Sequence, residues 1–150
     1  MMESFSIREY VSCDYPEVNN LWVAIGIGGA ERGDDNIVIL RTLSLGGKLF
    51  LLLSEDGEII GTSWLSTDGR RTYIHHFAIA KAFQRAGLAN KLLHHSLVYA
   101  KKEGLQVKLE VHRNNLAALN LYKKFKFTSL GDLEVLIIRN LNELDTILKS

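Results

Sequence analysis

The fold of this chain is decided by residues 72–100, TYIHHFAIAKAFQRAGLANKLLHHSLVYA. This stretch predicts a buried strand, then the short segment QRAGLA, then a helix that begins at the glycine. A glycine turn at a helix N-terminus presents backbone N–H groups that have no partner within the helix, at the positive end of the helix dipole. Such a turn can bind an anion, although many helices begin this way for structural reasons alone.

A second segment, residues 109–127, sharpens this interpretation. Its sequence, LEVHRNNLAALNLYKKFKF, predicts a strand, then Asn115, then a helix that carries Tyr122 seven residues later. Seven residues span about two helical turns, so both side chains project from nearly the same face. On the helix alone, a tyrosine on this apolar stripe is a core residue; beside the first segment, it is a candidate for chemistry.

The two segments, in this order, resemble the signatures of the GNAT family of N-acetyltransferases, which move an acetyl group from acetyl-CoA to an amine. The family's pyrophosphate loop, Arg/Gln-x-x-Gly-x-Gly/Ala, is matched by Gln84, Gly87 and Ala89. Its second signature, Asn-x-x-Ala-x-x-x-Tyr followed by Gly-Phe, is matched by Asn115, Ala118, Tyr122 and Phe127. Lys126 stands where the family usually has the glycine, which affects the turn after the helix rather than the chemistry.

The resemblance implies an α/β (α+β) fold that forms one acetyltransferase domain over residues 1–150. Its expected sheet is mixed and mostly antiparallel, with six to seven strands, helices on both faces and a splay between strands 4 and 5. Two hairpin turns, at Asp56-Gly57 and Asp68-Gly69, agree with this order. After the helix that follows Asn115, two further strands are predicted, at residues 127–130 and 134–139.

Composition sets further bounds. The 150 residues suffice for one domain with a proper core, and 18 basic against 17 acidic residues argue against a nucleic-acid surface driven by bulk charge. The one cysteine, Cys13, excludes an internal disulfide and favours a reducing compartment. The N-terminus does not read as a signal peptide, and no stretch approaches the ~20 apolar residues of a membrane span. We therefore expect a cytoplasmic protein without membrane or nucleic-acid partners.

The resemblance also assigns the cofactor, acetyl-CoA, and no metal. The pantetheine arm would lie between strands 4 and 5, where the backbone of the fourth strand binds it and one N–H polarises the thioester carbonyl, at Phe77, Ala78 and Ile79. The pyrophosphate would lie on the loop formed by Gln84, Arg85, Ala86, Gly87, Leu88 and Ala89. Asn115 would hold the pantetheine or cap its helix.

The catalytic assignments also follow from the resemblance. Tyr122 would protonate the leaving thiolate, a transfer that is uphill by roughly 1.5 pKa units for an ordinary phenol. Glu110 is the first candidate for the general base and His75 the second, and each is alternatively a hydrogen-bonded structural residue. Strand alternation predicts that His75 and His76 lie on opposite faces, so that both cannot face the substrate.

The predicted activity is direct acetyl transfer to a primary amine: a protein α-amino group, a lysine or a small molecule. Low-pKa amines are mildly favoured because they are appreciably neutral at pH 7. The joint between the first two helices offers candidates for substrate contact, namely Arg32, Asp34 and Asp35. The alternative is a non-catalytic module that binds acyl-CoA as a sensor. Either a monomer or a homodimer is compatible with the sequence.

Overall fold

The computed structural model describes residues 4–149, which form two compact units, one ending at His112 and the other beginning at Arg113. The first unit contains β1 (Ser6–Glu9), α1 (Tyr15–Ile25), α2 (Asn36–Ser44), β2 (Lys48–Leu53), β3 (Ile59–Thr67), β4 (Arg71–Ile79), α3 (Leu88–Glu103) and β5 (Gln106–Leu109). The second contains α4 (Leu116–Lys124) and a short 3₁₀ helix, Leu141–Leu144. The single domain expected over the whole chain stays a prediction. Over residues 4–149, none of the helices combines the length and apolar character needed to cross a bilayer.

The five strands form one sheet in the order β1-β2-β3-β4-β5. Neighbouring strands are antiparallel except for β4 and β5, which are parallel and are connected through α3. Both predicted hairpins are present, and each turns on a glycine with positive φ, 84° at Gly57 and 81° at Gly69. The mixed, mostly antiparallel sheet is confirmed.

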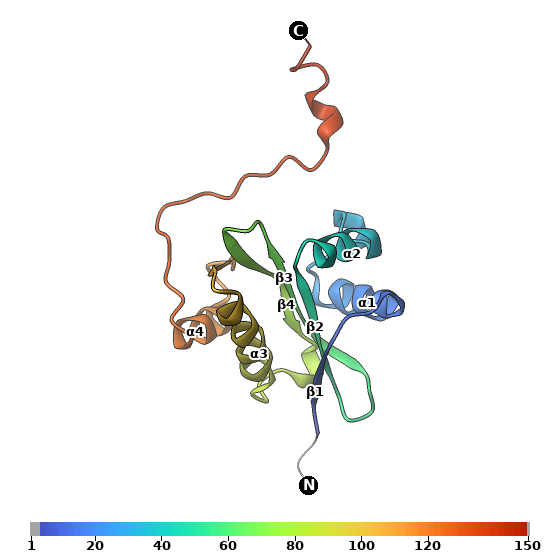
Figure 1. Ribbon diagram of the computed structural model, residues 1–150, viewed down its shortest axis with the longest axis vertical. Coiled ribbons are helices and arrows are strands. Elements are labelled where there is room, and N and C mark those ends of the chain that lie inside the picture. Colours follow the sequence, from blue (N-terminus) through green and yellow to red (C-terminus); the bar gives the residue numbers. More distant parts are fainter. Residues whose placement is uncertain (1–3, 150) are drawn as a thin grey trace. The chain divides into compact units, whose positions relative to one another are not determined.

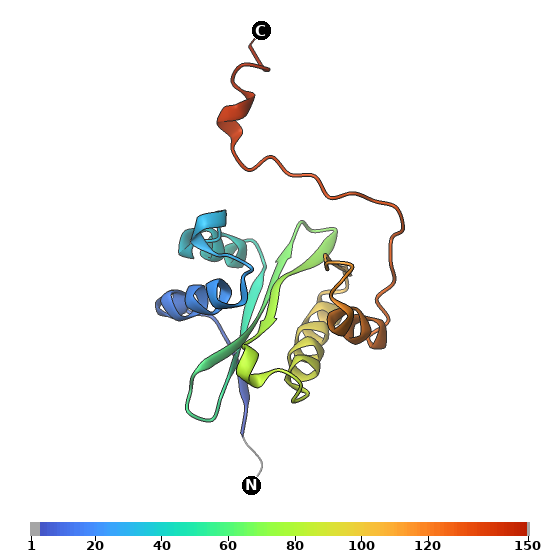
Figure 2. The same cartoon turned by 180° about the vertical axis from the view of Figure 1, so that it is seen from behind.

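Helices cover both faces of this sheet, as predicted. Figures 1 and 2 show α1 and α2 on one face and α3 on the other. On the α1 and α2 face, Trp22 and Trp64 stack with ring centroids 5.7 Å apart inside the main hydrophobic cluster. On the α3 face, the buried hydroxyl of Ser96 donates to Ser63 Oγ at 2.7 Å. The sheet thus separates two cores.

A bulge interrupts β4 where it pairs with β3. Thr62 lies opposite Ala78 and Trp64 lies opposite His75, so Ser63 faces two residues, His76 and Phe77. A bulge adds one residue and breaks the alternation of side chains. The rings of His75 and His76 accordingly both lie near Trp64, with centroids 5.9 Å and 5.6 Å away. The prediction that the two histidines lie on opposite faces is wrong for this reason.

The ladder between β4 and β5 is short. It pairs Arg71 with Gln106 and ends where Ile74 pairs with Leu109, whereas β4 continues to Ile79. β4 therefore extends beyond its pairing with β5 at the end where the fourth and fifth strands are predicted to separate. Glu110 lies immediately beyond the end of β5.

The sheet has five strands rather than the six to seven predicted. Residues 127–130 and 134–139 have strand-like sequences, but the structure assigns no strand to either segment. A strand forms only where another strand pairs with it, and an isolated hairpin is marginal in water. Lys126 nevertheless adopts the left-handed conformation, φ 74°, that the family's glycine would take, so the chain turns after α4 despite the substitution.

Candidate active site

The predicted phosphate loop follows β4 after a short 3₁₀ helix, Lys81–Phe83. The side-chain amide of Gln84 donates to the carbonyl of Ile79 at 2.9 Å, which fastens the start of the loop to the strand. Arg85 then takes a left-handed conformation with φ 66°, and Gly87 takes another with φ 76°. Leu88 is buried and anchors the first turn of α3, whereas the four residues before it are exposed. The loop is therefore exposed to solvent, while the buried Leu88 holds the start of α3 in place.

The N-terminus of α3 is not capped by a side chain. Gly87 occupies the N-cap position, makes no side-chain capping bond, and has no protein atom within 4 Å of the place where a Cβ would stand. The start of α3 therefore has no side-chain cap and has free space at Gly87, at the positive end of the helix dipole. An anionic group such as a pyrophosphate fits this arrangement.

The second candidate base, His75, is engaged with neighbouring side chains. Its Nε2 lies 2.7 Å from the hydroxyl of Ser66, and its ring stacks on Tyr73 with centroids 6.2 Å apart. Desolvation by the surrounding protein, followed by the nearby His76, lowers the pKa of His75, while Glu110 and Asp34 oppose this shift. His75 is therefore neutral near pH 7, as a base must be.

Glu110, the first candidate base, is exposed at the end of β5. Its carboxylate is close enough to His75 to oppose the lowering of the pKa of that ring. The structure thus brings Glu110 and His75 into electrostatic contact, and their catalytic roles stay predictions.

Of the three candidates for substrate contact at the joint between α1 and α2, one reaches β4. Asp34 Oδ2 lies 2.8 Å from Nε2 of His76. Asp35 instead caps α2 by accepting from the N–H of Val38 at 3.0 Å, and Arg32 donates to the carbonyl of Ile27 at 3.1 Å within the joint. The contact between Asp34 and His76 joins positions 42 residues apart, so no local sequence signal predicts it.

The second unit holds the other two predicted site residues. Asn115 caps α4 by accepting from the N–H of Ala118 at 3.2 Å, which is one of its two expected roles. Tyr122 is 7% exposed and its ring meets Phe127 edge-on, with centroids 5.6 Å apart. Burial raises the pKa of the Tyr122 phenol to about 12, above the ordinary value used in the sequence prediction.

Comparison with known proteins identifies the family. The model of the acetyltransferase (GNAT) family matches residues 10–127, which is most of the chain and includes both sequence signatures. The chain belongs to the GNAT family of acetyltransferases. It is therefore an enzyme of the N-acetyltransferase class.

Individual relatives agree with this assignment. An acetyltransferase of Pectobacterium atrosepticum is 26% identical over 125 residues, covering 83% of this chain and 88% of that protein. A GNAT-family acetyltransferase of Staphylococcus aureus Mu50 has the same fold, with a TM-score of 0.75 and 20% identity over 87% of this chain and 90% of that one. A GNAT-family acetyltransferase of Elizabethkingia anophelis, with acetyl-CoA bound, has a TM-score of 0.57 and 23% identity over 81% of this chain and 74% of that one.

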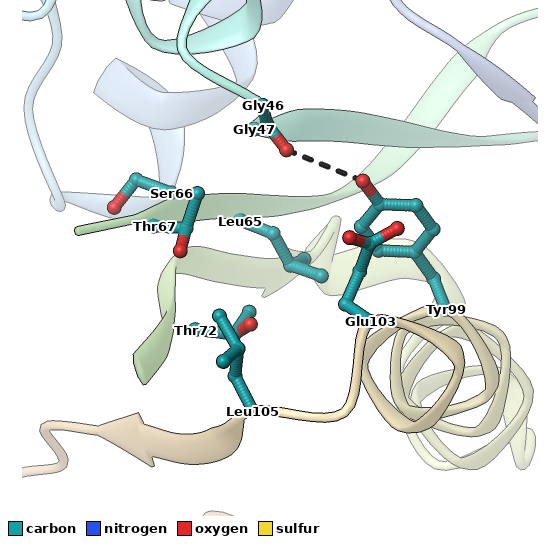
Figure 3. Close-up of a pocket in the computed structure, with 9 residues that line it drawn as sticks. All are labelled: Gly46, Gly47, Leu65, Ser66, Thr67, Thr72, Tyr99, Glu103 and Leu105. Carbon is teal, nitrogen blue, oxygen red and sulfur yellow. Dashed lines mark hydrogen bonds between the residues drawn. The ribbon is translucent and has the colours of Figure 1, made fainter. Parts of the chain in front are cut away.

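This GNAT protein also has a small hollow far along β4 from the phosphate loop. It lies beside the turn between β3 and β4 and encloses about 20 Å³, which is room for about one water molecule. At its rim the hydroxyl of Tyr99 donates to the carbonyl of Gly46 at 3.2 Å (Figure 3). The hollow is too small for a cofactor and we give it no functional role. Within residues 4–149, no three His, Cys, Asp or Glu side chains are grouped to hold a metal ion.

Proposed function

We propose that this GNAT protein transfers the acetyl group of acetyl-CoA directly to a primary amine. The observation that carries the proposal is the uncapped, glycine-led start of α3, which follows a strand that extends beyond its neighbour β5. Backbone donors at a helix start suit the pyrophosphate, and the separated strands suit a pantetheine arm between them. Acetyl-CoA supplies the activated acyl group, and the protein supplies position and hydrogen bonds.

In this proposal, the cofactor is held mainly by backbone groups. The extended stretch Phe77–Ile79 would bind the pantetheine, and one of its N–H groups would stabilise the negative charge that develops on the thioester oxygen. The loop Gln84–Ala89 would bind the pyrophosphate. Asn115 would act through the geometry of α4, which it caps.

Tyr122 would stabilise the departing sulfur. With the phenol pKa raised to about 12, full proton transfer to a thiolate with pKa about 8.5 is uphill by about 5 kcal/mol. That cost favours a phenol that donates a hydrogen bond to the sulfur over one that gives up its proton completely. The thiolate can then take its proton from solvent.

The acceptor would be a protein α-amino group or a small-molecule amine. Amines with pKa near 7.7–8.0 need little help to become neutral, whereas a lysine with pKa near 10.4 needs about 3.5 kcal/mol more. Lysine stays a third possibility for the acceptor. We further propose a cytoplasmic monomer or homodimer that works without metal, nucleic acid or membrane, because the net charge is near zero and the known chemistry needs none of them.

The test combines binding and turnover. Purified protein is titrated with CoA and acetyl-CoA, and release of free thiol is followed with a panel of α-amino, alkyl and lysine-containing acceptors. We expect saturating acetyl-CoA, at a hundredfold excess over its Kd, to raise the Tm by roughly 5–10 °C, which is the effect of about 2.7 kcal/mol on a domain of this size. Absence of any Tm shift with CoA would refute the proposed function. Binding without turnover on any acceptor would leave the acyl-CoA sensor instead.

A further inference from the structure

The bulge in β4 places His76 in an unusual backbone conformation. Its φ is 42°, in the left-handed region, which is uncommon for a residue other than glycine. Buried side chains hold it there: Thr62 Oγ1 donates to the carbonyl of His76 at 2.7 Å and accepts from Trp22 Nε1 at 2.9 Å. Strained residues that the surrounding structure maintains occur preferentially at functional sites, so this position calls for a functional explanation.

The ring of His76 is fixed as firmly as its backbone. It lies between two tryptophans, with its centroid 4.4 Å from that of Trp22 and 5.6 Å from that of Trp64. Its Nε2 lies 2.8 Å from Asp34 Oδ2, and the side chains of His76 and Asp34 keep 17% and 26% of their surface exposed. The pair is thus oriented by packing and still reaches solvent.

The contact with Asp34 fixes the tautomer of the ring. An ionised carboxylate only accepts hydrogen bonds, so Nε2 must carry the hydrogen, and Nδ1 of the neutral ring carries the lone pair. No hydrogen-bond partner of Nδ1 is found among the residues that the structure describes. A carboxylate that holds a histidine in one tautomer, with the other nitrogen available, is the arrangement that serves as a general base in hydrolases.

The position of His76 along the chain matches that chemistry. It directly precedes Phe77, where the backbone stretch proposed to hold the acetyl thioester begins. Because consecutive Cα atoms are about 3.8 Å apart, the backbone of His76 lies next to this stretch. Asp34 comes from the joint between α1 and α2, so it approaches His76 from the sheet face that α1 and α2 cover, which also carries Trp22.

The neighbouring bases are placed less favourably. The Nε2 of His75 bonds the hydroxyl of Ser66, which can donate or accept and so does not fix the tautomer of that ring, and Glu110 is exposed beyond β5. The titratable groups around the ring of His76 are Asp34 from the joint and His75 from the strand, with Glu110 acting on His75. In the first unit, His76 is the candidate base that combines a fixed tautomer with a fixed ring.

We propose that His76, positioned by Asp34, is the general base for the acceptor amine; this inference rests on the acetyl transfer proposed above. The amine nitrogen attacks the thioester carbonyl carbon, a C–N bond forms and the C–S bond breaks. The surplus proton of the amine moves to Nδ1 of His76, directly or through one water, and the sulfur leaves with its electron pair as the CoA thiolate. Asp34 touches no substrate and acts by holding the ring.

The test uses His76→Asn in the full chain, because asparagine tolerates positive φ better than most residues. We expect kcat to fall roughly 10²–10⁴-fold on an alkylamine acceptor, with the Kd for acetyl-CoA unchanged. The loss should be smaller on a weakly basic amine that is already neutral at the assay pH. His94→Asn, the same substitution on the exposed surface of α3, is the matched control and should leave both constants unchanged.

A second variant guards against a folding defect. His76→Gly suits the left-handed backbone and removes the ring, so added imidazole should restore part of the lost rate. Asp34→Asn should also lower kcat, and adding it to His76→Asn should cost little more, because residues that act as a unit are not additive.

The outcomes separate the two proposals. If the wild-type protein binds acetyl-CoA but acetylates no amine, the proposed function itself is refuted. An active wild type with undiminished kcat in His76→Asn, or a greater loss in His75→Asn than in His76→Asn, would overturn the assignment of His76. Equal losses on strongly and weakly basic amines, without rescue by imidazole, would show that the pair is structural only.

Discussion

The start and the end of α3 offer a matched pair of substitutions that isolates the phosphate site. Gly87 and Gly104 flank the same helix with nearly the same left-handed conformation, φ 76° and 79°, and a Cβ at either meets no protein atom within 4 Å. Replacing either residue with asparagine therefore costs the backbone preference alone, about 1 kcal/mol. For a chain of this size, that corresponds to a Tm lowered by roughly 2–4 °C in both variants.

The two variants should differ in cofactor binding. At position 87, the new side chain stands where the pyrophosphate is proposed to approach the first N–H groups of α3. Loss of one hydrogen bond to a charged group is worth about 1.5–3 kcal/mol, so the Kd for acetyl-CoA should rise roughly 10- to 150-fold. At position 104 the Kd should not change.

Isothermal titration calorimetry with acetyl-CoA and thermal melts of both variants measure these quantities. A Gly87→Asn variant with wild-type affinity would show that the phosphates bind elsewhere. Equal weakening in Gly104→Asn would show that the effect comes from the stability of α3 rather than from the ligand site.

Three further predictions concern single side chains. Tyr122→Phe removes one hydroxyl and keeps the buried ring, so loss of one hydrogen bond to the departing thiolate, worth about 1.5–3 kcal/mol, should lower kcat roughly 10- to 150-fold in the thiol-release assay with little change in acetyl-CoA affinity. Full activity would show that Tyr122 is a core residue without a catalytic role. Lys126→Gly should raise the Tm, because glycine relieves a left-handed backbone, φ 74°, worth about 1 kcal/mol; an unchanged or lower Tm would contradict this. The pKa of the Asp14 carboxyl is lowered by hydrogen bonds from Arg8 and, to a smaller extent, from the N–H of Val11. The carboxylate therefore stabilises the fold fully above its unfolded pKa of about 3.9, and this stabilisation is lost as the pH falls through the lowered pKa of the folded state. Urea unfolding of Asp14→Asn should accordingly show a deficit that is full above about pH 4 and shrinks below it; a deficit independent of pH would refute the role of the charge.

The elements that could be predicted from the sequence are those with local causes. The two hairpins are predicted by Asp-Gly pairs, and the start of the helix after Gly87 is predicted by the glycine turn itself. The splay between β4 and β5 is implied by the family resemblance, and the structure shows β4 extending beyond its last pair with β5, at Ile74.

What the sequence did not predict has causes that lie far apart in the chain. The bulge at His76 depends on Thr62 and Trp22, which the fold brings to it from another strand and a helix. The contact with Asp34 spans 42 positions. Residues 134–139 carry a strand-like pattern, but pairing is decided by a partner edge and not by propensity. For the same reason, periodicity placed His75 and His76 on opposite faces when a single added residue brings both to Trp64.

The uncapped start of α3 has an evolutionary consequence. A binding surface made of main-chain amides needs the shape of the turn and one open glycine, and most other side chains around it can change without removing a donor. The acceptor side, by contrast, is proposed to depend on side chains such as those of His76 and Asp34. Mutation can thus redirect an enzyme of this construction to a new amine while the acetyl donor stays the same.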